Sequence, residues 1–189
     1  MLNYLKLIKI LISLQIIFIS SMVPVFFNAT FTNKLKLEID TPITWQIPVL
    51  ILITLIFESK IVYKAFTIYL LLGLFFLPIL NQGGSLGYLL TPNFGYLLGL
   101  YPLIKIIDNL NTRNKINVGN FLKNGFIAIG AMHLTGIFYN FIQIIFYSQF
   151  NLFLYNLGKY SLGKIGYHFL MLFPLLLLIK PIERLKRSK

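Results

Sequence analysis

The sequence predicts an all-α integral membrane protein, a single compact six-helix transmembrane domain over residues 1–189 with both termini in the cytoplasm. Composition is the first reason: 57% of residues are hydrophobic and 12% are charged, whereas soluble domains carry roughly one quarter charged residues. Apolar stretches recurring from Leu2 to Ile182 are the second, and basic residues in alternate connections are the third. The chain has room for six spans of about 20 residues with short connections.

Six apolar stretches can be assigned as spans from hydropathy. They lie near Tyr4 to Phe27, Thr44 to Phe57, Ile61 to Leu80, Phe94 to Ile107, Phe121 to Tyr147 and Tyr160 to Ile179. The second and fourth are short, which predicts tilt, re-entry or burial by neighbouring helices. The run after Lys6 and Lys9 resembles a signal peptide, but it is too long and no A-x-A site follows, so a span is expected.

Basic residues predict the orientation of these spans. With both termini inside, the cytoplasmic side carries thirteen basic residues, and the outer side carries four, Lys34, Lys36, Lys159 and Lys164. The positive-inside rule predicts this asymmetry. The C-terminal run ERLKRSK is interpreted as a topology anchor that attracts anionic lipid headgroups. It is too short, and too poor in aromatic residues, to predict nucleic-acid binding.

The spans contain little that could support chemistry. Every acidic residue falls in a loop or at a span end, namely Glu38, Asp40, Glu58, Asp108 and Glu183. This placement argues against ion-coupled transport and intramembrane acid–base catalysis. Cysteine and a phosphate-binding loop are both absent from the sequence, so we expect no catalytic residues, no cofactor and no ATP hydrolysis by this chain.

The two histidines, His133 and His168, lie on different predicted spans without paired-ligand spacing, so no metal site is expected. His133 lies between Gly130 and Gly136, which predicts an interhelical hydrogen bond at a small-residue packing surface. His168 lies near the outer part of the last span and is a candidate pocket residue.

Two segments beside the second and third spans predict a ligand pocket at the outer face. The first, TPITWQ at residues 41–46, joins a turn to an interfacial tryptophan and offers polar groups at Thr44 and Gln46. The second follows YLLLGLFFLP, residues 69–78, where a proline disrupts the helix. Irregular backbone at membrane depth must be buried in protein or line a wet cavity, so residues 81–93 can form such a cavity.

The residues of this second segment and the start of the next span suit a small, largely neutral organic ligand. Gly83 and Gly84 let the backbone approach a ligand closely. Tyr88 and Tyr96 offer flat apolar faces with hydroxyl tips, and Asn93 offers an amide. A loop that only packs against helix ends would show the same pattern.

TPITWQ, YLLLGLFFLP, the glycine pair and TPNFGYLLG at residues 91–99 occur in the order and spacing of BioY-type biotin transporters, so residues 41–100 resemble this family. Its members are the substrate-binding, or S, components of energy-coupling factor transporters. The resemblance implies a compact six-helix domain, multi-pass in the cell inner (plasma) membrane. It implies binding of biotin or a related small vitamin near the outer face, and partners that comprise the lipid bilayer, a membrane coupling subunit and ATPase subunits.

The resemblance also implies which residues bind the vitamin: Thr44, Gln46, Gly83, Gly84, Tyr88, Asn93 and Tyr96. Two departures alter the family pattern. Thr91, Asn93 and Phe94 stand where the family usually has Gly, Thr and Gly around Pro92. In the last span, Lys164 and Tyr167 stand at the acidic and lysine positions of a Gly-Asp-x-x-Lys pattern, so both join His168 as candidates.

The expected function is high-affinity capture and membrane transport of biotin, with ATP hydrolysed by partner subunits. We expect Tyr88 and Tyr96 to pack on the apolar part of the ligand, Asn93 and Gln46 to bind its polar ring, and Lys164 to face its carboxylate. An S component for another vitamin, a membrane-embedded enzyme acting on lipid, and an assembly scaffold remain alternatives.

Overall fold

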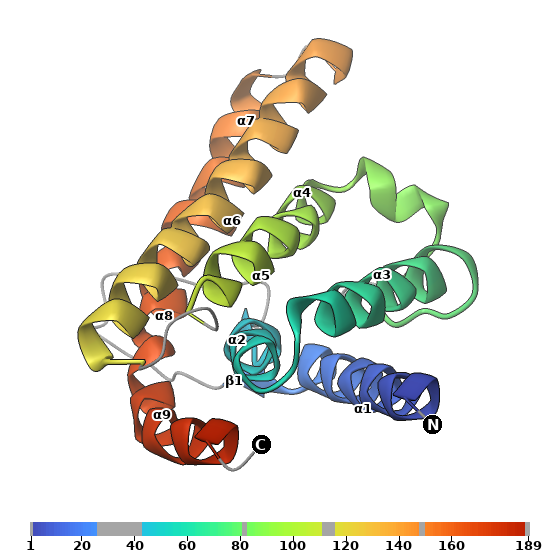
Figure 1. Ribbon diagram of the computed structural model, residues 1–189. Helices are drawn as coiled ribbons and strands as arrows, with labels where there is room; N and C mark the ends of the chain where they lie inside the picture. The colour runs from blue at the N-terminus through green and yellow to red at the C-terminus, as the bar shows by residue number, and fades with distance from the viewer. Residues whose placement is uncertain (1, 26–42, 81–82, 111–115, 148–149, 188–189) are drawn as a thin grey trace.

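The computed structural model describes residues 2–25, 43–80, 83–110, 116–147 and 150–187. The chain is predominantly helical, as predicted, and Figure 1 shows its elements. In chain order these are α1 Leu2–Met22, β1 Pro24–Val25, β2 Ile43–Thr44, α2 Gln46–Ile56, α3 Ser59–Phe75, the 3₁₀ helix η1 Leu86–Leu90, α4 Pro92–Leu98, α5 Leu100–Asp108, α6 Val118–Tyr147, α7 Phe150–Asn156, the π-helix η2 Leu157–Leu162, α8 Gly163–Leu170 and α9 Leu172–Arg187.

Length and composition identify candidate membrane spans among the described residues. The segments Tyr4–Met22 and Val118–Ile145 are each long and apolar enough to cross a membrane. Phe150–Leu170 continues into Leu172–Leu185 with a bend of 41°, and the two together form a third candidate. The remaining apolar helices are shorter.

Burial by its neighbours explains how the short helix α2 is accommodated. It packs against α1, α3, α5 and α9, and Figure 1 shows it nearly end-on among them. Leu50 and Ile51 at its centre are fully buried. A helix of 11 residues covers about 16 Å, roughly half of a hydrocarbon core. Protein therefore surrounds α2 where lipid would surround a longer span.

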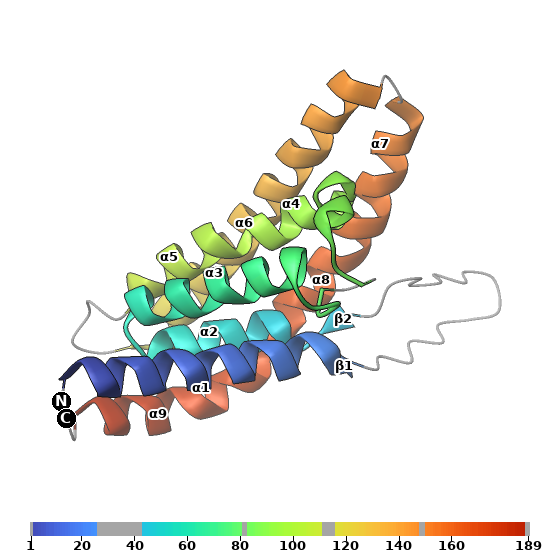
Figure 2. The same cartoon turned by 90° about the vertical axis from the view of Figure 1, so that its right-hand side faces the viewer.

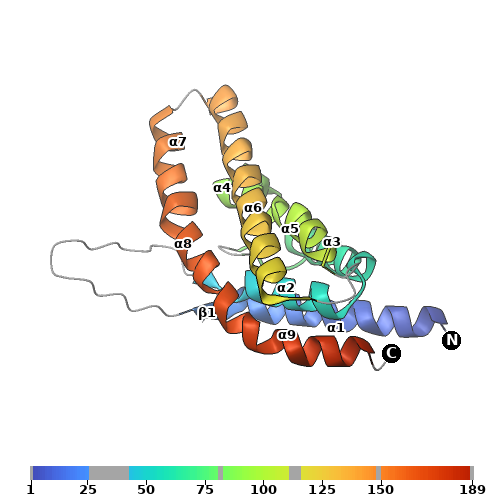
Figure 3. The same cartoon turned by 60° about the vertical axis from the view of Figure 1, so that its left-hand side comes forward.

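The second half of the chain is built around α6. Helices α4 and α5 pack along one side of it, and η2 and α8 pack along another. Figure 3 shows α6 and the α7–α8 arm running antiparallel. Gly99, between α4 and α5, permits this packing, because a Cβ there would lie 2.5 Å from the carbonyl oxygen of Met132.

Helix ends differ from the predicted spans for local reasons. The first helix ends at Met22, before the predicted Phe27, because Pro24 enters a two-stranded antiparallel ladder in which it pairs with Thr44. This ladder departs from the all-α prediction. The third helix ends at Phe75, before the predicted Leu80, because proline at position 78 disfavours helix in the residue that precedes it.

The last helical segment of the chain begins with α7 at Phe150, well before Tyr160, where the last span was predicted to begin. The charged residue Lys159 lowers the local hydropathy, so the predicted span began only after it. Its amine lies 5.5 Å from the ring centre of Tyr155 and 5.8 Å from that of Tyr160. Aromatic faces attract the charge, and the helical backbone continues across Lys159 in η2.

Candidate functional site

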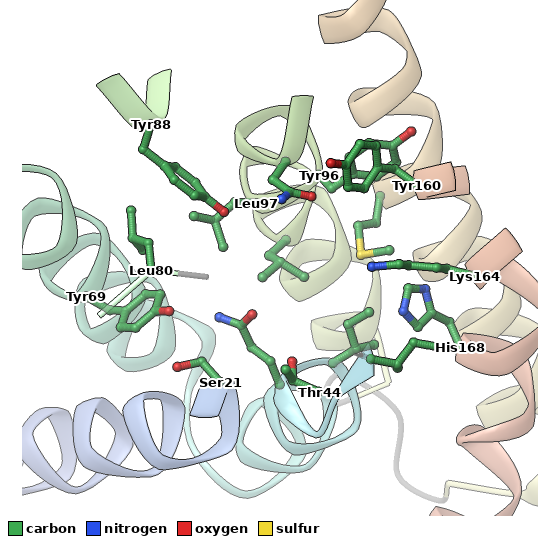
Figure 4. A pocket seen from close by; sticks show the side chains of 16 residues that line it. Ser21, Thr44, Tyr69, Leu80, Tyr88, Tyr96, Leu97, Tyr160, Lys164 and His168 are labelled. Atoms are coloured by element: carbon green, nitrogen blue, oxygen red, sulfur yellow. The ribbon is translucent and has the colours of Figure 1, made fainter. Parts of the chain in front are cut away.

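A cavity of about 110 Å³, here called the central cavity, lies between the ends of α1 and α3, the starts of α2 and α4, and the side of α8. Figure 4 shows the side chains around it. Its lining residues are Ser21, Ile43, Thr44, Gln46, Ile47, Tyr69, Leu80, Tyr88, Asn93, Tyr96, Leu97, Leu100, Met132, Tyr160, Lys164 and His168.

The β-ladder fixes the wall that contains Thr44 and Gln46. The backbone N–H of Trp45 donates to the carbonyl of Val23 over 3.1 Å, so the segment before α2 is held against the end of α1. Gln46 is the first residue of α2, and its Nε2 is buried without a hydrogen-bond partner among the described residues. Buried donors are normally paired, so this Nε2 donor is available to a ligand.

Two hydroxyls that the sequence reading did not single out lie on the same side as Thr44 in Figure 4. Ser21 donates to the Phe18 carbonyl over 2.7 Å, and Tyr69 donates to the Ile79 carbonyl over 3.3 Å. Each hydroxyl oxygen keeps the capacity to accept a hydrogen bond. Ser21 resembles any serine at a helix end and Tyr69 lies in an apolar run, so no local signal identified them.

Gly83 and Gly84 do not line the central cavity. Their backbone conformation sets the path of the following segment, which contributes Tyr88 and Asn93 to the lining. The φ angles of the two glycines are +113° and +156°, which side chains other than glycine rarely adopt. A Cβ on Gly84 would lie 2.5 Å from the carbonyl oxygen of Gly73 in α3. Gly83 also bridges to Leu80, whose side chain packs on Gly73 and lines the cavity.

Tyr88, Asn93 and Tyr96 all line the central cavity. The Tyr88 ring packs edge-on against Phe94 with centres 6.3 Å apart, and burial raises the pKa of its phenol, so the hydroxyl stays protonated. Asn93 has a buried Nδ2 without a hydrogen-bond partner in the described chain. Tyr96 packs so closely on Gly136 of α6 that a Cβ there would overlap its ring.

Lys164 supplies a cation from the opposite wall, and in Figure 4 it lies beside His168 and Tyr160, across the cavity from Tyr69 and Ser21. The side chain is 9% exposed, and its amine lies 5.6 Å from the ring centre of Tyr160. Within the described residues no acidic side chain pairs with it. Tyr167, the other candidate in this region, is partly exposed and outside the cavity lining.

A chain of buried hydrogen bonds supports this wall. Ser161 Oγ lies 2.8 Å from the Tyr96 hydroxyl and 3.1 Å from His133 Nδ1, and His133 Nε2 lies 3.0 Å from His168 Nδ1. The predicted interhelical hydrogen bond of His133 is therefore present. The chain joins two residues of the cavity lining, Tyr96 and His168, through two that lie behind it.

The hydrogen bonds of this chain are coupled in direction. A neutral imidazole has one donor and one acceptor nitrogen. If His133 donates to His168, it accepts from Ser161, and the remaining nitrogen of His168 is a donor. If the bonds reverse, that nitrogen becomes an acceptor. The group that His168 presents to the cavity therefore depends on the state of His133 and Ser161.

Comparisons with known proteins agree with this architecture. A crystal structure at 2.1 Å of the S-component for biotin from an ECF-type ABC transporter matches with a TM-score of 0.62 and 16% sequence identity, covering 98% of this chain and 92% of that one. At this identity the match establishes a shared fold. No curated protein sequence matches the chain. A family model described as the BioY family matches residues 4–172. Because this match spans most of the sequence, the chain belongs to the BioY family.

Proposed function

We propose that this chain captures biotin at the outer face of the plasma membrane and carries it inward as the substrate-binding component of an energy-coupling factor transporter. A membrane coupling subunit and ATPase subunits supply the energy, and the chain catalyses no covalent change. Family membership supports this role, as does the likeness to an S-component for biotin.

The observation that carries the choice of ligand is the buried amine of Lys164 in a cavity whose lining contains no acidic residue. A buried cation favours an anionic partner, and biotin carries one carboxylate at the end of an aliphatic chain. Across the cavity lie Ser21, Tyr69 and the unpaired Nε2 donor of Gln46. These polar groups suit the uncharged cyclic urea at the other end of the vitamin.

The other candidate residues are assigned to contacts that agree with this orientation of biotin. Tyr88 and Tyr96 pack against the apolar part of the ligand, and Asn93 joins Gln46 in binding the cyclic urea. His168 presents its remaining ring nitrogen beside Lys164. Gly83 and Gly84 act indirectly by setting the path of the loop, whereas Thr44 contributes a hydroxyl at the cavity edge. Tyr167 has no role in this arrangement, since it lies outside the lining.

The chain forms one domain of six spans with both termini in the cytoplasm. In Figure 2 the start of α1 and the end of α9 lie at the same end of the molecule. These regions carry Lys6, Lys9, Lys180 and Arg184, which the positive-inside rule assigns to the cytoplasm. The central cavity lies toward the opposite end, beside the final turn of α1, where it can receive ligand from outside.

Titration of the purified, ligand-free protein in detergent with biotin tests the proposal. We expect one-to-one binding by calorimetry, together with a change in the fluorescence of Trp45, the one tryptophan in the sequence and a neighbour of the lining residues Thr44 and Gln46. Biotin amide, which lacks the carboxylate charge, should bind more weakly. Absence of biotin binding in protein with a cooperative thermal transition would refute the assignment of biotin and redirect the search to other small carboxylates.

A further inference from the structure

A second cavity, of about 190 Å³, adjoins the first but has no part in the proposed function. Two of its walls continue walls of the central cavity: Asn140 lies one turn beyond Gly136, on which Tyr96 packs, and Asn156 lies one turn before Tyr160. The second cavity is lined by Leu90, Pro92, Asn140, Gln143, Ile144, Leu152, Phe153 and Asn156.

Asn140 is the feature of this cavity that calls for a ligand. Its side chain is 3% exposed, and neither its amide oxygen nor its amide nitrogen makes a hydrogen bond of normal geometry among the described residues. The Tyr96 hydroxyl is a weak side-chain hydrogen-bond partner of this amide, but its short hydrogen bond, at 2.8 Å, is with Ser161. Buried amides in folded proteins are normally satisfied by hydrogen bonds. We therefore expect Asn140 to bind a partner that the described chain does not supply.

The other lining residues restrict what that partner can be. None of them is charged, which disfavours an ionic ligand. Leu90, Ile144, Leu152 and Phe153 provide apolar surface, and Gln143 Nε2 is already engaged with the Leu90 carbonyl over 2.8 Å. A primary amide presents a donor and an acceptor side by side. Its complement is a group that carries an N–H and a C=O on the same edge.

We propose that the second cavity is a binding site for a small neutral molecule with a lactam or cyclic urea group, which pairs with both amide atoms of Asn140 while its apolar part contacts Leu152 and Phe153. The proposal goes beyond the transport role and concerns a different cavity. It therefore holds whatever occupies the central cavity.

The test uses 2-imidazolidinone, the simplest cyclic urea, on the full chain labelled with ¹⁵N in its asparagine and glutamine side chains. We expect saturable shifts of the Asn140 and Asn156 amide signals. The control compound, 1,3-dimethyl-2-imidazolidinone, has the same ring without N–H donors and should bind at least tenfold more weakly. Equal shifts with both compounds, or no shift of Asn140, would overturn the proposal without the need for any variant.

A matched pair of variants locates the site. Asn140→Leu should weaken the response of Asn156 to 2-imidazolidinone at least tenfold, because it removes both hydrogen-bonding atoms. Asn93→Leu makes the same chemical change in the central cavity and should leave the response unchanged. Loss of the response in Asn93→Leu, or its persistence in Asn140→Leu, would place the compound elsewhere. Because biotin takes no part, failure here is distinct from failure of the proposed function.

Discussion

The central cavity has two walls of different construction. The loop wall, made by residues 43–47, 80 and 83–93, presents uncharged groups such as Gln46 and Tyr88, and its path depends on backbone that glycine permits at positions 83 and 84. The helix wall, made by η2 and α8, presents Lys164 and His168 from regular helical backbone. A hydrogen-bond chain that reaches α6 holds His168 in place.

Because the two walls are built differently, they respond differently to changes of backbone and of side chain. On the loop wall, the position of each polar group follows from the fold of an irregular segment, so a change of backbone moves several contacts together. On the helix wall the charge and the imidazole are each fixed by their own helix position, so a change of side chain alters one interaction. We infer that the helix wall selects a charged end of the ligand and the loop wall fits its neutral body.

Lys164→Met should have the largest effect on biotin affinity, because it removes the cation of the helix wall and keeps similar volume. Truncating one partner of a buried charge pair costs about 2–5 kcal/mol, so biotin affinity should fall about 100-fold. Calorimetry with biotin and biotin amide checks this, and the affinity for the amide should change little. Equal losses for both ligands would show that Lys164 does not read the carboxylate.

Gly84→Ala tests the loop wall through its backbone. The added Cβ would lie 2.5 Å from the Gly73 carbonyl oxygen in a region of φ that side chains disfavour. Strain and overpacking together should lower the free energy of unfolding by about 3 kcal/mol. Gly83→Ala has strain but open space around the Cβ and should cost about 1–2 kcal/mol. Thermal unfolding followed by Trp45 fluorescence compares the two, and equal costs would contradict the close approach of Gly84 to α3.

His133→Leu tests whether the hydrogen-bond chain positions the helix wall. It leaves His168 and Ser161 without their shared partner, at a cost to stability of about 2 kcal/mol. Biotin affinity should fall about fivefold although His133 lies behind the lining, because His168 loses its orientation. Ser161→Ala leaves the His133–His168 bond intact and should have a smaller effect on affinity. A larger effect of Ser161→Ala would mean that Tyr96, not His168, transmits the change.

The two walls also differ in how far sequence reveals them. His168 was identified as a polar residue in an apolar span, where such residues are rare, and Lys164 was identified by its position in the pattern of the family that the sequence resembles. Gln46, Tyr88, Asn93 and Tyr96 were found because amides and tyrosines at span ends suit ligand binding, and the structure brings all of them to one cavity with Lys164 and His168.

What the sequence could not provide depends on tertiary contacts. The glycine pair was expected to meet a ligand, whereas Gly84 meets the α3 backbone, a contact between residues of one folded loop. Ser21 joins the cavity because the ladder between Pro24 and Thr44 brings the end of α1 to the start of α2. No hydropathy pattern encodes that pairing. The helical class required only composition and hydropathy, and it was predicted.

Asn93→Leu should have the smallest effect on stability, and the sign of that effect tests how the loop wall uses its polar groups. The buried Nδ2 of Asn93 has no partner in the described chain, so its removal should leave the free energy of unfolding unchanged or raise it by about 1 kcal/mol. Biotin affinity should nevertheless fall about tenfold, since the loop wall loses one hydrogen bond to the ligand.

Gln143→Leu is the matched control for Asn93→Leu. That amide already donates to the Leu90 carbonyl over 2.8 Å, so its loss should cost about 1 kcal/mol of stability and leave biotin affinity unchanged. An Asn93 variant that lost stability and kept its affinity would mean that the amide serves the fold, and the loop wall would then contact the ligand through fewer polar groups than we infer.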